Sequence, residues 1–130
     1  MAPRLEELGE RSTLRVASRI GLSGTPHTSG DWNLSGWGVG ASIAVDSTDL
    51  VGIVVITSGG SAVSPNPTAT LTFVDGPFSS PPLVFQSPRD INGATGFVVT
   101  DAQIDTVTWT FVGTPAISTG YYLSYINFDR

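Results

Sequence analysis

The chain has no cysteine and no lysine among its 130 residues, and only 13% of its residues are charged. Without cysteine the fold has no disulfide and no thiolate metal site. An average globular domain carries about 25% charged residues. A surface this poor in charge must therefore use Ser, Thr, Asn and Gly, or be partly covered by other subunits.

Long apolar runs are also absent. The first residues, MAPRLEELGERS, lack the apolar core of a secretory signal, and no stretch approaches the ~20 apolar residues of a membrane span. The formal net charge of −5 disfavours a polyanionic partner. We therefore expect no general secretion, no membrane insertion and no nucleic-acid partner.

Glycine and proline are plentiful, with 15 Gly and 9 Pro, and this favours short strands joined by tight turns. The range 69–86 shows the pattern most clearly. Apolar residues at 69, 71 and 73 alternate with threonines until Asp75-Gly76-Pro77 breaks the run. Pro81-Pro82 then starts a second strand over 83–85, and their missing N–H groups predict that this strand begins at a sheet edge.

Similar patterns predict further strands at 39–45, 50–57, 96–100, 106–112 and 121–128. The range 50–57 is apolar on both parities, so we expect this strand to be covered on both faces. Alternation places Leu71, Phe73, Trp109 and Phe111 in the core. About seven short strands at this spacing predict an all-β fold, an antiparallel β-sandwich or a jelly-roll-like domain.

The two ends of the chain differ in charge. Four Arg face three Glu up to residue 19, whereas two Arg face eight Asp from residue 20 onward, a net charge of −6. We interpret residues 1–30 as an N-terminal docking arm with a loop and residues 31–130 as the β-sandwich domain. The range 24–36 has the composition of a long surface loop.

The arm combines apolar and basic side chains. Leu5 and Leu8, between Pro3 and Gly9, could form a helix of two turns at most. Beyond Arg11 the period becomes two, with an apolar edge at 14, 16, 20 and 22 opposite a basic edge. Either the arm is the first strand of its own domain, or it docks on a neighbouring protein and offers its arginines to carboxylates. The candidate partner-binding residues are Leu5, Leu8, Arg11, Arg15 and Arg19.

Signals for catalysis are weak. A triad would need His27, the single histidine, which lies in the Gly/Ser/Thr-rich range and is better interpreted as a polar loop residue. The carboxylate pairs Asp46/Asp49 and Asp101/Asp105 fall where turns are expected. A calcium site at the first pair matches no ligand spacing. We expect no catalytic residue, no metal and no cofactor.

The aromatic residues allow two interpretations. Five of them could stack on sugar rings if they were exposed: Trp32, Trp37, Tyr121, Tyr122 and Tyr125. Packing in the core or in a subunit interface is the better interpretation, because aromatic side chains dominate both kinds of burial.

Three stretches carry a resemblance to a known family: WGVGASIAV at 37–45, ATLTF at 69–73 with PPLVF at 81–85, and GYYLSYI at 120–126. From about residue 31 to 128 the chain resembles the β-rich surface domains of tailed-bacteriophage virion proteins, found in capsid decoration proteins and fibres. The resemblance implies a homotrimer with an adhesive or structural role. It carries over no catalytic residue.

The leading expectation is a non-enzymatic structural protein of a tailed-phage virion, a capsid decoration (cement or head-fibre) protein. Its N-terminal arm would attach to another virion protein such as the major capsid protein. The chain begins with Met1 and shows no coiled-coil shaft, which favours this over a fibre fragment. The alternatives are a receptor- or glycan-binding tip domain of a tail fibre, which would bind host-surface glycan, and, more remotely, a glycan hydrolase.

Overall fold

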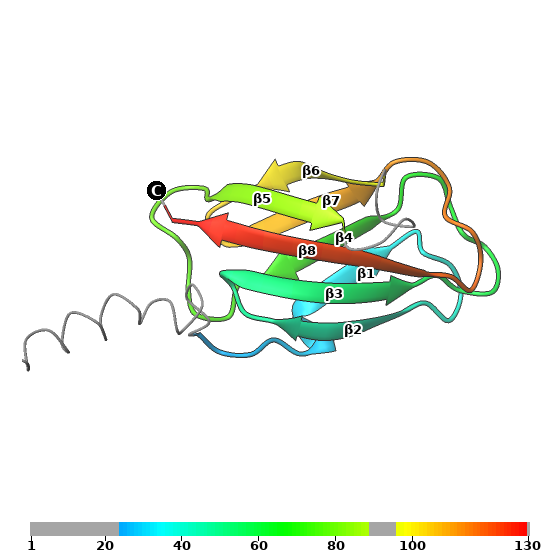
Figure 1. Ribbon diagram of the computed structural model, residues 1–130, viewed down its shortest axis with the longest axis horizontal. Coiled ribbons are helices and arrows are strands. Elements are labelled where there is room, and N and C mark those ends of the chain that lie inside the picture. The colour runs from blue at the N-terminus through cyan, green and yellow to red at the C-terminus, as the bar shows by residue number, and fades with distance from the viewer. Residues whose placement is uncertain (1–23, 89–95, 130) are drawn as a thin grey trace, which may run out of the picture.

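Two antiparallel sheets pack face to face as a β-sandwich in this computed structural model, which describes residues 24–88 and 96–129 (Figure 1). The first sheet has the order β1-β4-β7-β6, with β1 at Trp32–Ser35, β4 at Thr68–Thr72, β7 at Thr106–Phe111 and β6 at Phe97–Ala102. The second has the order β2-β3-β8-β5, with β2 at Ser42–Ser47, β3 at Val51–Thr57, β8 at Gly120–Phe128 and β5 at Leu83–Pro88. A 3₁₀ turn, η1 at Ser29–Asp31, precedes β1. The expected all-β sandwich is confirmed.

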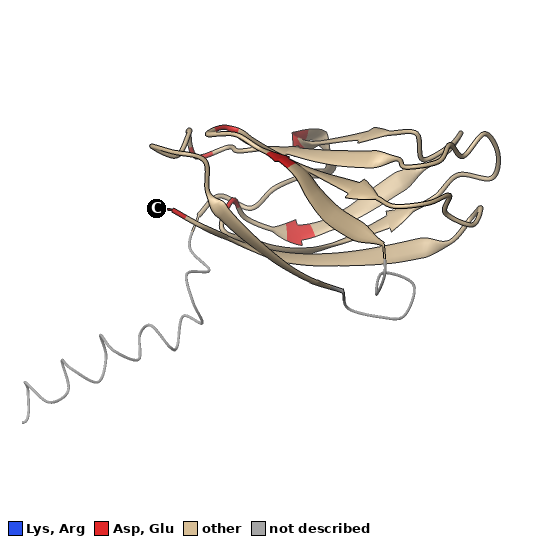
Figure 2. Ribbon diagram, turned by 90° about the horizontal axis from the view of Figure 1, so that it is seen from above, with Lys and Arg blue, Asp and Glu red and all other residues tan. Residues whose placement is uncertain are grey.

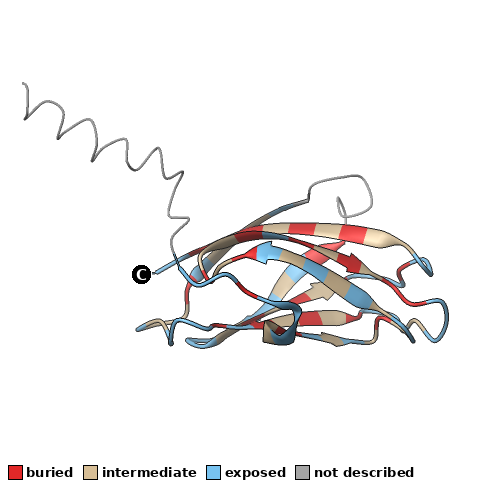
Figure 3. Ribbon diagram, turned by 90° about the horizontal axis from the view of Figure 1, so that it is seen from below, coloured by how far each residue is buried: buried red, intermediate tan, exposed pale blue. Residues whose placement is uncertain are grey.

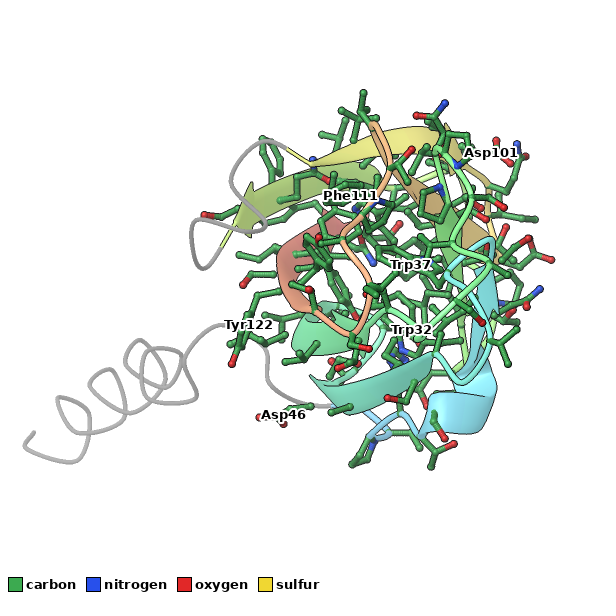
Figure 4. The ribbon with its side chains drawn as sticks, turned by 90° about the vertical axis from the view of Figure 1, so that its right-hand side faces the viewer. Trp32, Trp37, Asp46, Asp101, Phe111 and Tyr122 are labelled. Atoms are coloured by element: carbon green, nitrogen blue, oxygen red, sulfur yellow. The ribbon has the colours of Figure 1, made fainter. Side chains whose placement is uncertain are left out.

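Period-two alternation generates the core. Buried and more exposed residues follow one another along the strands, most regularly in β7 and β8 (Figure 3). The four residues expected inside, Leu71, Phe73, Trp109 and Phe111, are all buried. Both tryptophans of the suspected sugar platform, Trp32 and Trp37, also lie between the sheets (Figure 4). Trp37 donates its indole N–H to the carbonyl oxygen of Thr68 at 2.9 Å.

The range 69–86 forms a corner between the layers. β4 belongs to the first sheet and β5 to the second, and the turn at Asp75-Gly76-Pro77 lies on the path between them. β5 is an edge strand, as the two prolines before it predict.

Three expectations about the strands need correction. The range 24–36 is not all loop, because β1 occupies its last part and pairs with β4. The strand expected over 39–45 begins at Ser42, and Val39 is 68% exposed. The strand over 50–57 is not covered on both faces by the described residues: Val54 and Ile56 are fully buried, whereas Ile53 on the opposite face is 37% exposed.

The outward faces of the two sheets differ in chemistry. The first sheet presents threonines, which bond across strands from Thr70 to Thr108 at 2.9 Å and from Thr100 to Thr110 at 2.8 Å. The second presents mainly aliphatic and aromatic side chains from β3, β8 and β5.

Candidate functional site

The first described residues join the sandwich through a polar cluster, which we call the root network: the buried His27, Ser47 and Asp49 and the exposed Thr25 and Asp75. His27 is its centre. Its Nε2 lies 2.6 Å from Asp49 Oδ1 and its Nδ1 lies 2.8 Å from Ser47 Oγ. Its backbone N–H also donates to the carbonyl oxygen of Ser47 at 2.8 Å. The segment before β1 is thereby held against the end of β2.

Asp49 joins this segment to the turn after β4. Its Oδ1 also accepts the backbone N–H of Val74 at 3.0 Å, and its Oδ2 accepts that of Asp75 at 2.9 Å. The side chain of Asn127 donates to the Asp49 carbonyl oxygen at 2.8 Å. A carboxylate only 4% exposed is tolerated here because several donors surround it.

Asp75 fixes the point at which residue 24 leaves the sandwich. Its carboxylate accepts the Thr25 hydroxyl at 2.6 Å and the Thr25 backbone N–H at 2.9 Å. The hydroxyl bond, followed by the backbone bond, lowers the pKa of the Asp75 carboxyl below its usual 3.8. Nearby, Tyr125 donates to the Thr48 carbonyl oxygen at 2.6 Å, and burial raises the pKa of its phenol.

The root network brings together the three residue types of a catalytic triad, Ser47, His27 and Asp49. Its surroundings suit a structural role better. Ser47 is 7% exposed and its Cβ packs so closely against Gly52 that a Cβ added there would lie 2.0 Å away. A nucleophile must be reached by a substrate carbonyl beside oxyanion donors, and Ser47 is only 7% exposed.

His27 is a polar loop residue, as expected, but it is buried, so the surface position expected for the range 24–36 is wrong at this residue. It is 6% exposed, and its partners lie 20 and 22 residues along the chain. No local pattern marks these three residues as neighbours, because the contact arises only when β2 folds beside residues 25–28. Thr48-Asp49 after an apolar strand predicts a turn but says nothing of what the turn binds.

A second feature is an apolar groove on the outward face of the second sheet. It is a hollow of about 340 Å³, and its side-chain walls come mainly from β3, β8 and β5: Val51, Ile53, Phe85, Ser87, Ser124 and Ile126. Phe85 is 57% exposed and packs edge to face on Phe128, with ring centroids 5.4 Å apart. Asp46 and Tyr122 also point away from the core on this side (Figure 4).

The strand register explains the hollow. One row across the sheet carries three large side chains, because Ile126 lies opposite both Val51 and Phe85. The next row carries Ile53 opposite Ser124, and Ser124 opposite Ser87. Two small serines beside a row of large residues leave a depression.

The groove continues toward the root network. A second hollow of about 420 Å³ shares Val51, Gly52 and Ile53 with the groove and is also lined by Gly24 and Pro26. The described chain therefore begins beside the apolar groove.

The site residues expected from the sequence divide into two groups. Leu5, Leu8, Arg11, Arg15 and Arg19 lie outside the described residues. The carboxylate pairs lie within them but form no shared site: Asp46 is exposed, whereas Asp49 is buried in the root network. Asp101 lies near the end of β6 and Asp105 in the turn before β7, both exposed, and Gln103 donates to Asp101 at 2.7 Å. No group of three potential ligand residues that could hold a metal ion occurs within 24–88 and 96–129.

The Asp, Glu, Arg and Lys side chains within the described residues are all acidic. Seven Asp and no Arg or Lys lie within residues 24–88 and 96–129, as the absence of blue on the ribbon shows (Figure 2). All six arginines lie in the remaining segments. The sandwich therefore presents an acidic field to anything that approaches it.

Comparison of the chain with protein-family models, with curated proteins and with solved structures finds no match. Within the described residues, no helix is long and apolar enough to cross a bilayer.

Proposed function

We propose that the protein is a non-enzymatic structural component of a tailed-bacteriophage virion, a trimeric capsid decoration protein attached through its N-terminal arm. The observation that carries the proposal is the division of charge between an acidic β-sandwich and an arginine-bearing segment joined to it. The resemblance of the strand motifs at 37–45, 69–85 and 120–126 adds the virion context.

The two ends of the sandwich also support attachment at one pole. The root network and the C-terminal end of β8 lie at the same end of the molecule, whereas the β3–β4 and β7–β8 loops lie at the other (Figure 1). A domain anchored at its root would project the opposite loops outward. The root network holds Thr25 at this end of the sandwich, so that attachment through the residues before it would orient the whole domain.

The arm's arginines provide the first test. On a partner surface they would pair with carboxylates and fix the register of docking. Arg15→Glu with Arg19→Glu should weaken rebinding to stripped particles at least tenfold while leaving the melting temperature unchanged, because exposed charges contribute little to folding. The matched control is Val98→Glu, which adds a negative charge on the outer face of the first sheet, away from the root network. Equal rebinding of wild-type and double variant would contradict the proposal.

A short truncation tests the apolar part of the attachment. Removal of residues 2–9 deletes Leu5 and Leu8 and leaves every described residue in place. We expect a folded protein that no longer saturates stripped particles, measured by co-sedimentation. The virion context itself is tested by mass spectrometry of purified phage particles from the encoding culture. If the chain is absent from these particles, the protein is not a virion component.

One observation favours the alternative of a receptor-binding tip. Val39, Val112 and Ile117 are 68%, 55% and 59% exposed, and they lie in or next to the loops at the end opposite the root network. Exposed apolar side chains on loops are typical of protein contacts. The glycan form of this alternative loses its main support, because Trp32, Trp37, Tyr121 and Tyr125 are all buried. A blank glycan array combined with host-cell binding would favour a protein receptor.

A further inference from the structure

We propose that the apolar groove on the second sheet binds residues 12–22 of the same chain. The segment would lie extended along β8, with its apolar edge against the sheet and its arginines facing outward. This inference concerns the isolated protein and does not require a virion.

The apolar groove exposes large apolar side chains that another segment or protein could bury. Ile53, Leu83, Phe85 and Phe128 are 37%, 47%, 57% and 44% exposed, all on one side of the second sheet. The first sheet, built from the same chain, places bonded threonines in the equivalent position. In a sheet with one face in water, each strand alternates apolar residues toward the core with polar residues toward the solvent. β3 instead reads VGIVVIT, apolar on both parities, which is the pattern of a strand buried on both sides.

The size of the groove favours a single segment as its occupant. Three strands about 4.8 Å apart and three rows about 6.8 Å apart span on the order of 300 Å². A stable contact with a second copy needs roughly 800 Å² per partner. One extended segment of about ten residues would cover the groove, and its side chains on one edge repeat at the same ~6.8 Å spacing as the rows.

The place where the described chain begins favours its own N-terminal segment. Gly24 lines the hollow that shares Val51 and Ile53 with the groove, and the Thr25–Asp75 bonds hold it there. Ten extended residues reach about 33 Å, which is longer than β8. The segment therefore reaches every row of the groove from its root.

The pattern of the segment matches the groove. Leu14, Val16, Ile20 and Leu22 share one parity, and Arg11, Arg15 and Arg19 share the other. With the first set on the sheet, the arginines point away from it, about 13 Å apart. Residues 12–22 carry two positive charges, Arg15 and Arg19, and no negative one, while the described sandwich carries seven Asp and no Arg or Lys. A second copy of the acidic sandwich would be repelled at this distance.

Docking of residues 12–22 on the apolar groove would also help the protein to attach to a partner. The same segment would seal the apolar face with one edge and present a row of arginines with the other. A partner would then meet a pre-ordered row of charges, which lowers the entropy lost on binding.

Disulfide trapping tests the contact, because the chain has no cysteine of its own. Ile20→Cys is combined with Ser124→Cys in the groove, or with Thr108→Cys at the middle of the other outer face as the matched control. Under mild oxidation at low micromolar concentration, we expect the first pair to close within one chain at least tenfold faster than the second. Equal rates, no disulfide, or disulfides only between chains would overturn the proposal.

Binding of an apolar dye gives an independent measurement. Val16→Asp with Ile20→Asp should release the segment and raise dye fluorescence severalfold, while the near-ultraviolet signal of the buried tryptophans stays unchanged. Arg15→Glu with Arg19→Glu is the matched control and should leave dye fluorescence at the wild-type level. Unchanged fluorescence in the aspartate variant would overturn the proposal. Neither measurement uses particles, so their outcome is separate from that of the attachment test.

Discussion

Gly52 shows how closely the root network is packed. It sits in β3 opposite Ser47 and Tyr125, and an added Cβ would lie 2.0 Å from Ser47 Cβ and 3.1 Å from Tyr125 Cε1. Relief requires Ser47 to move, and Ser47 Oγ and its carbonyl oxygen both bond to His27. A single methyl group therefore acts on the whole network.

Gly52→Ala should lower the free energy of unfolding by about 1–3 kcal/mol, the usual cost of overpacking a core. Gly60→Ala is the control, because its nearest atom, Ser118 Oγ, would be 3.8 Å away. Urea denaturation of both variants measures the difference. Equal midpoints would show that the end of β2 is less tightly packed than described.

Asp75 makes the stability of the root depend on pH. Its pKa is lowered in the folded state by the bonds from Thr25, so these bonds stabilise the fold above about pH 4 and lose their effect as the pH falls through the lowered value. Asp75→Asn should therefore melt below wild-type at pH 7, and the difference should disappear as the Asp75 carboxyl of the wild-type protein becomes protonated in acid. Asp129→Asn serves as the control and should melt with wild-type at pH 7. A gap for Asp75→Asn that persists at low pH would contradict this assignment.

The strands are the part of the molecule that the sequence predicts best. Alternation is set locally, by side chains two apart, so β4, β7 and β8 can be found without knowing their neighbours. β1 was missed because only Trp32 and Leu34 in its four residues show the pattern, and its pairing with β4 supplies the rest. The root network was missed for a stronger reason: His27, Ser47 and Asp49 become neighbours only through tertiary contacts.

The strand predicted over 50–57 is present as β3, but the expected cover on both of its faces is not found among the described residues. Its apolar residues on both parities do indicate two covered faces, but a strand pattern cannot say which element supplies the cover. The first sheet buries Val54 and Ile56, and no described element lies over Ile53. The mismatch itself points to the apolar groove.

The two residues that follow β4 differ in burial, and this difference can be tested by substitution. Phe73 is 8% exposed and stacks on Phe78 with ring centroids 4.7 Å apart, whereas its neighbour Val74 is 37% exposed. Phe73→Ala should lower the free energy of unfolding by about 3–5 kcal/mol. Val74→Ala is the matched control and should cost under about 0.5 kcal/mol, as surface substitutions do. Similar thermal midpoints for the two variants would mean that the parity is reversed.

At the scale of the whole molecule, the division of charge is the feature that local structure does not explain. A sandwich with seven Asp and no Arg or Lys repels its own copies, yet its surface has few ionic groups for its size. A trimer would therefore depend on apolar contacts. The aromatic last strand does not supply them, because Tyr121 and Tyr125 are buried within each sandwich. The exposed side chains of Val39 and Ile117, at the end opposite the root, are available instead.

We expect light scattering at micromolar concentration to give a mass about three times the 13.6 kDa of the chain. The mass should persist in 1 M salt, where the Debye length of about 3 Å screens charges but leaves apolar contacts intact. Val39→Ser with Ile117→Ser should dissociate the trimer, and Val98→Ser, on the outer face of the first sheet, should not. A monomer for the wild-type protein would refute trimerisation. A double variant that stays trimeric would leave these two side chains available for a receptor and shift the balance toward a binding tip.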